Sequence, residues 1–315
     1  MSEQVTRPLP QVSVVEFVAM MALMMALVAF STDAMLPAFP QMAQALSPMA
    51  HNRVQLVVTL FLLGLGLGMI FAGPLSDHFG RKPVLLGGTL VYMMGALLCW
   101  RAGSLELLLV GRVIQGIGAS ATRTVSVAMV RDLYSGRQMA QITSFIMMVF
   151  TIFPAMAPTF GEAVMAHADW RFIFVALIGV AVAGTGWFGL RQGETLTPER
   201  RIPFRFGSIL TRAHGILSMR LVVIMMAVQA FAAGTLFATL SSIQQIFDVT
   251  FGRAEQFHLW FAGIAVLSGC SGAINAMVVK RVGMRFMILL MLHAQIIMSG
   301  LAAILLGFGL LPLGG

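Results

Sequence analysis

Two ionisable side chains lie inside or at the edge of long apolar runs, where charge is costly. Asp33 closes a run that begins near residue 15, and Arg112 lies within a run at about 105–129. An ionisable residue at membrane depth is a functional candidate by default. A buried carboxylate is also harder to ionise than one in water, so it can bind and release a proton near neutral pH. We therefore interpret Asp33 as a proton-binding candidate; the alternative is that it caps the outer end of its helix.

A possible pair and two further polar candidates follow from the position of Arg112. Counted from the outer ends of their runs, Arg112 and Asp33 lie at similar depth, so they could form a pair, either for coupling or as a static buried ion pair. Arg123 follows about three helical turns later, on roughly the same face. It either lines a cavity or reaches the cytoplasmic surface. Gln115 is a further candidate for contact with a substrate.

The composition indicates that most of the chain is embedded in a lipid bilayer. The chain is 58% hydrophobic and 10% charged, with a mean hydropathy of +0.90, whereas soluble domains carry about 25% charged residues. The net charge of +8 comes from Lys and Arg in short loops between apolar runs, which does not make a nucleic-acid groove. The two cysteines and six histidines show no spacing for a disulfide framework or a metal site, and no nucleophile–base arrangement indicates an enzyme.

Nine apolar runs are long enough to cross a bilayer, which takes about 20 residues. They must be helices, because backbone polar groups in lipid have to be satisfied within the segment. With the N-terminus in the cytoplasm, the predicted inner segments hold 14 Lys and Arg and the outer ones 4, which favours this orientation. The predicted spans are about 15–36, 54–75, 84–101, 105–129, 140–162, 170–190, 220–244, 257–279 and 286–308.

An internal repeat predicts how the spans are grouped. Gly80 and Gly283 each precede a basic residue and a new apolar run, and a shift of 203 residues superimposes the first three spans on the last three. The polar interval 191–219 reads as a solvated cytoplasmic linker. We therefore expect a six-helix bundle at 1–190, the linker at 191–219 and a partial bundle of three helices at 220–315.

The loop after the second span carries the most specific pattern, Gly73-x-Leu75-x-Asp77-x-x-Gly80-Arg81-Lys82. We expect Gly73 to allow close helix approach, Gly80 to allow a tight turn, and Asp77 to accept from a helix N-terminus or an arginine. This pattern resembles the loop signature of the major facilitator superfamily. The resemblance implies a conformational switch at this loop.

Other segments resemble the Bcr/CflA drug-resistance exporters of that superfamily, and one resembles the fourth-span signature of its proton-coupled members. The resemblance implies an all-α membrane bundle that exports small amphiphilic, drug-like compounds by alternating access in a bacterial inner membrane. Inward proton flow would supply the energy, and no cofactor or nucleic acid would take part. The Bcr/CflA-like segments are Ser31–Ala38, Arg131–Tyr134, Trp170–Phe174 and Glu194–Arg201, and the fourth-span signature is Gly111–Gly118.

The fifth span resembles the proline–glycine signature of antiporters. Pro154, Pro158 and Gly161 follow one another at spacings of four and three residues. Proline kinks a helix and glycine lets a partner approach, so we expect a hinge here. Glu162 stands where the family usually has a second glycine, and its role stays open.

The resemblance implies twelve spans, whereas nine are predicted, so we expect a chain truncated after the ninth span. Two other hypotheses follow from this. The chain could be an inactive remnant of an exporter, or a membrane sensor or assembly partner that transports nothing. Its oligomeric state and its particular substrates are left open by the sequence.

Overall fold

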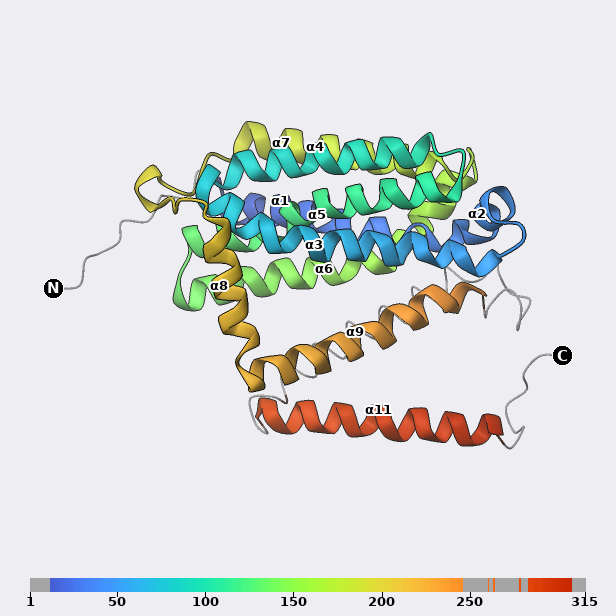
Figure 1. The fold of residues 1–315 in the computed structure, drawn as a ribbon. Coiled ribbons are helices and arrows are strands. Elements are labelled where there is room, and N and C mark those ends of the chain that lie inside the picture. Colours follow the sequence, from blue (N-terminus) through green and yellow to red (C-terminus); the bar gives the residue numbers. More distant parts are fainter. Residues whose placement is uncertain (1–11, 246–259, 261–262, 264–277, 279–282, 308–315) are drawn as a thin grey trace. The chain divides into compact units, whose positions relative to one another are not determined.

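The computed structural model describes residues 12–245, 260, 263, 278 and 283–307, and the elements described there are helices (Figure 1). This confirms the all-α prediction. The predicted span at 257–279 lies outside the described residues, apart from three single positions. The long helices are α1 (Val14–Asp33), α3 (Leu56–Phe79), α4 (Arg81–Trp100), α5 (Leu105–Leu133), α6 (Gly136–Met165), α7 (Phe172–Arg191), α9 (Arg220–Gln245) and α11 (Met284–Gly307).

Six candidate spans in the described part are long and apolar enough to cross a membrane, and the bent α6 makes a seventh. Seven of the helices, α1, α3 to α7 and α9, coincide with predicted spans one to seven, and α11 coincides with the ninth. The count of nine spans stays a prediction, because the eighth falls on residues that are not described.

The chain divides into two compact units, Met1–Ser241 and Ser242–Gly315. In the first unit Gly80 has φ +106° and in the second Gly283 has φ +84°, and each directly precedes a helix. The two helices begin at Arg81 and Met284, 203 residues apart, as the repeat predicts. The shared turn supports the repeat, while the predicted domain boundaries stay a prediction.

Glycines bring α5 into backbone contact with two neighbours. A Cβ at Gly116 would meet the Phe61 carbonyl oxygen on α3, and a Cβ at Gly118 would meet the Tyr92 backbone nitrogen on α4. Small residues let helices pack this closely in a membrane protein. The glycines of the fourth-span signature therefore hold α5 between α3 and α4, and this fixes where Arg112 lies.

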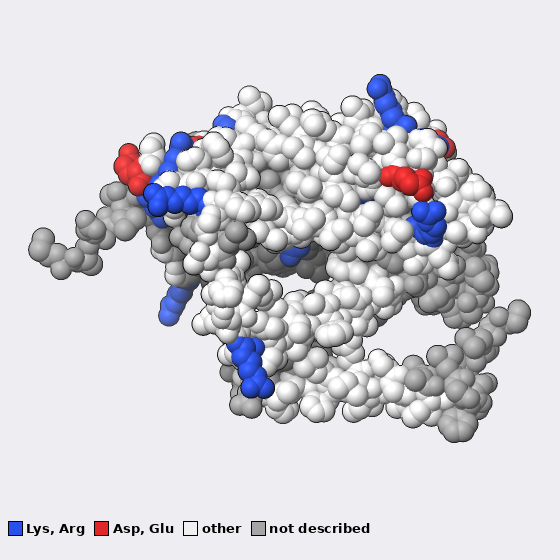
Figure 2. Space-filling model, in the orientation of Figure 1, with Lys and Arg blue, Asp and Glu red and all other residues white. Residues whose placement is uncertain are grey.

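Charged side chains gather at the two ends of the α1–α7 bundle, and an almost uncharged band lies between them (Figure 2). Large apolar side chains stay exposed in that band, among them Met94 at 62% and Val182 at 55%. Such a surface suits lipid rather than water. At one end of the bundle, α3 ends at Phe79 and α4 begins at Arg81. We call it the linker end, because the segment 192–205, which connects α7 to α8 (Phe206–Leu217), starts there.

The interval 191–219 is more ordered than the predicted solvated linker. It contains a short 3-10 turn, Pro198–Arg200, and then the helix α8, Phe206–Leu217. The predicted linker loop therefore contains a helix at residues 206–217, and its role as a cytoplasmic linker stays a prediction. On the opposite side of the bundle, a 3-10 turn (Leu36–Ala38), α2 (Phe39–Leu46) and a second 3-10 turn (His51–Gln55) connect α1 to α3.

Candidate functional site

Arg112 is the centre of a buried polar cluster inside the bundle. Its side chain is fully buried. The Nε atom donates to the Val57 carbonyl oxygen at 2.9 Å, one terminal nitrogen donates to Gln115 Oε1 at 2.7 Å, and the other donates to the Ser31 carbonyl oxygen at 2.6 Å. The guanidinium thus joins the backbones of α1 and α3 to α5 through neutral oxygens.

Aromatic rings complete the surroundings of the Arg112 charge. The guanidinium carbon lies 4.5 Å from the ring centroid of Phe61 and 6.0 Å from that of Phe174. Within the described residues no carboxylate oxygen lies within 4.0 Å of Arg112. The predicted pair with Asp33 is therefore absent from this conformation. Arg112 reaches the backbone of α1 two residues before Asp33 instead, because the close α3–α5 contact aims it at carbonyl oxygens.

Asp33 is buried at the last residue of α1, with 6% of its surface exposed. The next residue, Ala34, is in backbone contact with α6, since a Cβ at Gly161 would meet the Ala34 carbonyl oxygen. Phe30 also lies against this part of α6, with ring centroids 5.5 Å from Phe153 and 5.2 Å from Phe160. Movement of the C-terminal half of α6 would therefore act directly on the end of α1 that carries Asp33.

Two members of the cluster were not predicted from the sequence. The Tyr92 hydroxyl and Ser31 Oγ lie 2.7 Å apart and share a hydrogen bond. Gln115 uses Oε1 to accept from Arg112, and its Nε2 is buried with no hydrogen-bond partner in the described part. Gln115 thus keeps a buried donor, and its contact with a substrate stays a prediction. Tyr92 could have been suspected, since it is one of only two tyrosines in the chain.

The prolines of α6 accompany a bend. The helix changes direction by 41° between Gly136–Pro154 and Met156–Met165. Pro158 and Gly161 are buried on the second part, Met156–Met165. A proline removes a backbone hydrogen bond and crowds the preceding turn, which explains the bend. That the bend works as a hinge stays a prediction. Glu162 follows Gly161 and is half-buried.

At the linker end, Arg81 is the centre of a second polar cluster. Its Nε donates to Asp132 Oδ2 at 2.9 Å, and one terminal nitrogen donates to Ser76 Oγ at 2.7 Å and to Asp77 Oδ1 at 2.6 Å. The side chains of Arg81 and Asp132 are only 9% and 7% exposed. Asp77 thus accepts from an arginine, one of its two predicted partners. Asp132 and Ser76 were not predicted as site residues.

Glu194, which follows α7 in the chain, caps the first turn of α4. Its two carboxylate oxygens accept from the backbone nitrogens of Arg81 at 2.9 Å and Lys82 at 3.1 Å. A carboxylate at a helix N-terminus satisfies donors that have no partner in the helix and suits the helix dipole. The neighbouring Thr195 donates from Oγ1 to Asp132 at 3.3 Å, which ties the linker to the cluster.

Gly73 does not have its predicted role in this structure. A Cβ there would meet nothing closer than Thr124 Cγ2 at 3.9 Å, which is ordinary contact. The close approaches lie earlier on α3, where a Cβ at Gly64 would meet the backbone of Val113 and a Cβ at Gly68 would meet Ser120 and Ile117 on α5. Gly80 does form the predicted turn with positive φ, and Lys82 donates from Nζ to the Gly189 carbonyl oxygen on α7 at 2.7 Å.

Arg123 lies apart from Arg112. It is exposed and lines a cleft of about 430 Å³ at the linker end, together with Asp77, Arg81 and Arg131. Eleven residues of helix separate it from Arg112, or roughly 16 Å along α5. Of the two positions considered from the sequence, the structure therefore favours the one near the surface, beside the loop that joins α3 and α4.

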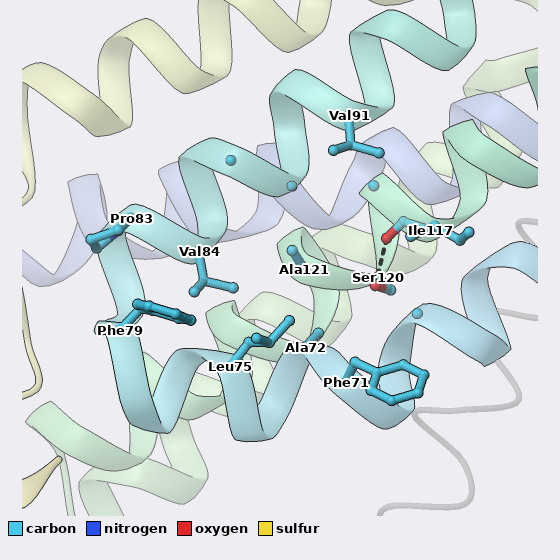
Figure 3. Close-up of a pocket in the computed structure, with 14 residues that line it drawn as sticks. Phe71, Ala72, Leu75, Phe79, Pro83, Val84, Val91, Ile117, Ser120 and Ala121 are labelled. Carbon is cyan, nitrogen blue, oxygen red and sulfur yellow. Dashed lines mark hydrogen bonds between the residues drawn. The ribbon is translucent and has the colours of Figure 1, made fainter. Parts of the chain in front are cut away.

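An apolar groove of about 510 Å³ lies between α3, α4 and α5 (Figure 3). Phe71, Leu75 and Phe79 line it from α3, and Val84 lines it from α4. Ser120, whose hydroxyl donates to the Ile117 carbonyl oxygen at 2.6 Å, contributes one of its few polar groups. With no ionisable side chain in its wall, the groove does not provide the chemistry of proton coupling.

Tyr134 directly follows α5 and packs against Phe17, with ring centroids 5.7 Å apart. Its hydroxyl is buried and has no hydrogen-bond partner among the described residues. Burial raises the pKa of Tyr134, so it stays neutral at physiological pH. It stabilises the packing of α1 on α5 and adds no charge to the linker end.

A sequence profile described as Major Facilitator Superfamily matches residues 21–314. The chain belongs to the Major Facilitator Superfamily. Its members are transporters, so the protein is not an enzyme. Together with its apolar helices and bacterial relatives, this membership makes it a multi-pass protein of the bacterial inner membrane.

Several curated relatives are similar to the chain. The bicyclomycin resistance protein homolog of Haemophilus influenzae is 30% identical over 95% of the chain and 76% of its own length. The uncharacterized MFS-type transporter YdgK of Bacillus subtilis is 32% identical over 75% of the chain and 60% of its own length. The multidrug resistance protein MdtL of Salmonella heidelberg is 34% identical over 54% of the chain and 43% of its own length. The chain thus spans between 43% and 76% of the length of these three relatives.

Solved structures show the same fold. A crystal structure of a D-xylose-proton symporter superimposes with a TM-score of 0.65 at 15% sequence identity, covering 85% of this chain and 69% of that one. At this identity the likeness is one of fold alone. It agrees with the helical bundle that superfamily membership implies.

Proposed function

We propose that the protein exports small amphiphilic, drug-like compounds from the cytoplasm in exchange for protons. Two of its relatives are named for resistance to bicyclomycin and to multiple drugs. The proton gradient is the energy source, and the N-terminus lies in the cytoplasm, where the linker end meets the inner leaflet.

One observation carries the proton-coupling part of this proposal. Asp33 and Asp132 are the acids less than a tenth exposed in the described part of the chain. Asp132 is held by Arg81, whereas Asp33 forms no ion pair with any described residue. A buried carboxylate without a cation beside it is favoured in its protonated form. Asp33 is therefore the acid that can exchange a proton without first breaking an ion pair.

The buried cluster suggests how the proton and the substrate exclude one another. Arg112 holds α1 by the Ser31 carbonyl oxygen, and Asp33 lies about half a turn further along the same helix. Deprotonation of Asp33 would place a negative charge close to this guanidinium and favour a different hydrogen-bond arrangement. Coupling requires only that proton binding and drug binding favour different arrangements.

Drug susceptibility tests the proposal. The protein is expressed in a drug-sensitive strain that lacks its own exporters, and growth is measured against a panel of amphiphilic drugs. We expect raised resistance with the native chain and loss of that resistance with Asp33→Asn, which cannot take up and release a proton. Glu106→Gln is the matched control, since Glu106 lies in an exposed ion pair with Arg53.

Unchanged susceptibility with a chain that is inserted in the membrane at the native level would contradict export. That result would favour the inactive remnant, or the sensor or assembly partner. Resistance that survives Asp33→Asn would leave export standing and remove Asp33 from the coupling mechanism.

A further inference from the structure

The helix α8 has one apolar and one polar side. At about 100° per residue, Phe206, Ala213, Ile216 and Leu217 fall within one arc of roughly 100°. Thr211, His214 and two glycines fall on the opposite arc. Phe206, Ile216 and Leu217 are 50–56% exposed, so the apolar side is largely uncovered by described residues.

Contacts with α3 fix where α8 begins. The backbone nitrogen of Ile202 donates to the Asp77 carbonyl oxygen at 3.0 Å, and that of Phe204 donates to His78 Nδ1 at 3.2 Å. The ring of Phe206 then stacks on Phe71, with centroids 6.4 Å apart and planes within 7°. The chain before α8 therefore runs back along α3 from its linker end.

These contacts place α8 at the level of a membrane surface. Phe71 lies eight residues before Phe79, the last residue of α3, or about 12 Å along the axis. With 24 residues, α3 is about 36 Å long, slightly longer than the roughly 30 Å hydrocarbon core. With the core centred on α3, Phe71 lies about 9 Å inside the edge of that core. The ring of Phe206, stacked on Phe71, is held at that depth, which is within the roughly 5–10 Å reached by the apolar face of an interfacial helix. From there α8 runs across the direction of the bundle helices rather than alongside them (Figure 1).

The charge around α8 is strongly positive. Residues 198–220 contain five arginines and one acid, Glu199. Arg205 directly precedes α8, and Arg220 follows it by three residues; both are exposed. Basic residues that flank an apolar arc are typical of helices that lie in an anionic lipid surface. An apolar protein partner would account for the exposed arc and not for this charge.

We propose that α8 lies in the plane of the inner leaflet, with its apolar arc in the acyl boundary and its flanking arginines on anionic phospholipid headgroups. Phe71 also lines the groove of Figure 3, so apolar surface continues from α8 onto the bundle. The linker is thereby tied to the membrane close to the switch loop. This lipid site is independent of what the protein transports.

Site-directed labelling of the full chain tests the proposal. Cys99 and Cys270 are replaced by alanine, and an environment-sensitive fluorophore is attached through Leu217→Cys on the apolar arc or through Thr211→Cys on the polar one. Each protein is placed in nanodiscs of phosphatidylcholine, with or without phosphatidylglycerol, and quenching by lipids that carry a quencher in the acyl chain is measured.

We expect quenching at position 217 and none at 211, with stronger quenching when phosphatidylglycerol is present. Arg205→Gln with Arg220→Gln should lower the ratio of docked to undocked α8 roughly 30-fold, since each charge contributes about 1 kcal/mol at an anionic surface. Arg53→Gln, at the other end of the bundle, should change nothing. If quenching at position 217 is the same with and without phosphatidylglycerol, and the same in the double arginine variant, the anionic lipid site is overturned. A label at 217 that is shielded equally in lipid-free detergent would instead show a protein contact and overturn the proposal.

Discussion

The guanidinium of Arg112 donates to the backbone carbonyl oxygen of Ser31 at 2.6 Å, and both residues are fully buried. This bond joins the helix that carries the fourth-span signature to the helix that ends at Asp33. The charge is stabilised by three neutral oxygens and two aromatic rings, and no carboxylate oxygen of the described residues lies within 4.0 Å of it. Arg112 therefore controls the position of α1 through its backbone.

Arg112→Lys should damage the protein even though it keeps the charge. A lysine ammonium cannot reproduce the fork that reaches Val57, Gln115 and Ser31 at once. Leaving one or two of these buried oxygens without a donor should lower the free energy of unfolding by about 1–3 kcal/mol. Equilibrium unfolding in mixed micelles measures this, with the exposed Arg53→Lys as control. Equal stability of the two variants would show that the fork is dispensable.

The glycines of α5 should tolerate no side chain. Gly116→Ala and Gly118→Ala would each press a methyl group on the backbone of a neighbouring helix, and overpacking of this kind costs about 1–3 kcal/mol. Gly87→Ala, where a Cβ meets nothing within 4 Å, should be neutral or slightly stabilising. The melting temperature of each purified variant decides this. Three variants with the same melting temperature would contradict the packing described here.

The linker-end cluster should depend on Asp132 more than on an exposed acid. Asp132→Asn removes a buried partner of Arg81, although Asp77 and Ser76 remain, so we expect a loss of about 1–3 kcal/mol in unfolding free energy. Glu106→Gln breaks an exposed pair and should cost at most about 1 kcal/mol. A larger effect of Glu106→Gln than of Asp132→Asn would contradict this ranking.

The two tyrosines of the chain should respond oppositely to loss of the hydroxyl. Tyr92→Phe breaks the bond to Ser31 and should destabilise the protein by about 1 kcal/mol. Tyr134→Phe removes a buried hydroxyl without a described partner and should be neutral or stabilising.

The Tyr134→Phe difference should also grow with pH. Burial raises the pKa of Tyr134, so above its ordinary value of about 10 the unfolded chain releases this proton first and native stability falls. The phenylalanine variant lacks that loss. Unfolding measured at neutral pH and above about pH 10 checks both points; a stability gap that narrows with rising pH would contradict the burial of Tyr134.

Much of the fold could be predicted from the sequence, because the length of an apolar run predicts a membrane span. The glycine turns at Gly80 and Gly283 are also visible in the sequence as a repeated pattern. The pairing of Arg112 could not be predicted. Depth along two spans says nothing about which way a side chain is turned, and the glycines of α5 turn Arg112 toward carbonyl oxygens. Glu194 likewise was visible only as part of a resembling segment. Its role as a cap on α4 depends on a contact across more than a hundred residues.

Helix α8 was not predicted from the sequence, although its pattern is local. Its twelve residues are too few to cross a membrane and are enclosed by arginines, so the interval was predicted as solvated. The amphipathic spacing was present in the sequence. The stacking of Phe206 on Phe71, which supports the proposed depth of the helix, joins residues 135 positions apart in the chain and has no local sequence signal.

Proton movement in reconstituted vesicles tests the central claim most directly. Vesicles that contain the purified protein are loaded with a pH-sensitive dye, and an outwardly or inwardly directed drug gradient is applied. We predict a drug-dependent proton flux opposite in direction to the drug, present in the native chain and in Glu106→Gln and absent in Asp33→Asn. Drug movement without any proton flux, or a full flux in Asp33→Asn, would contradict proton exchange at Asp33.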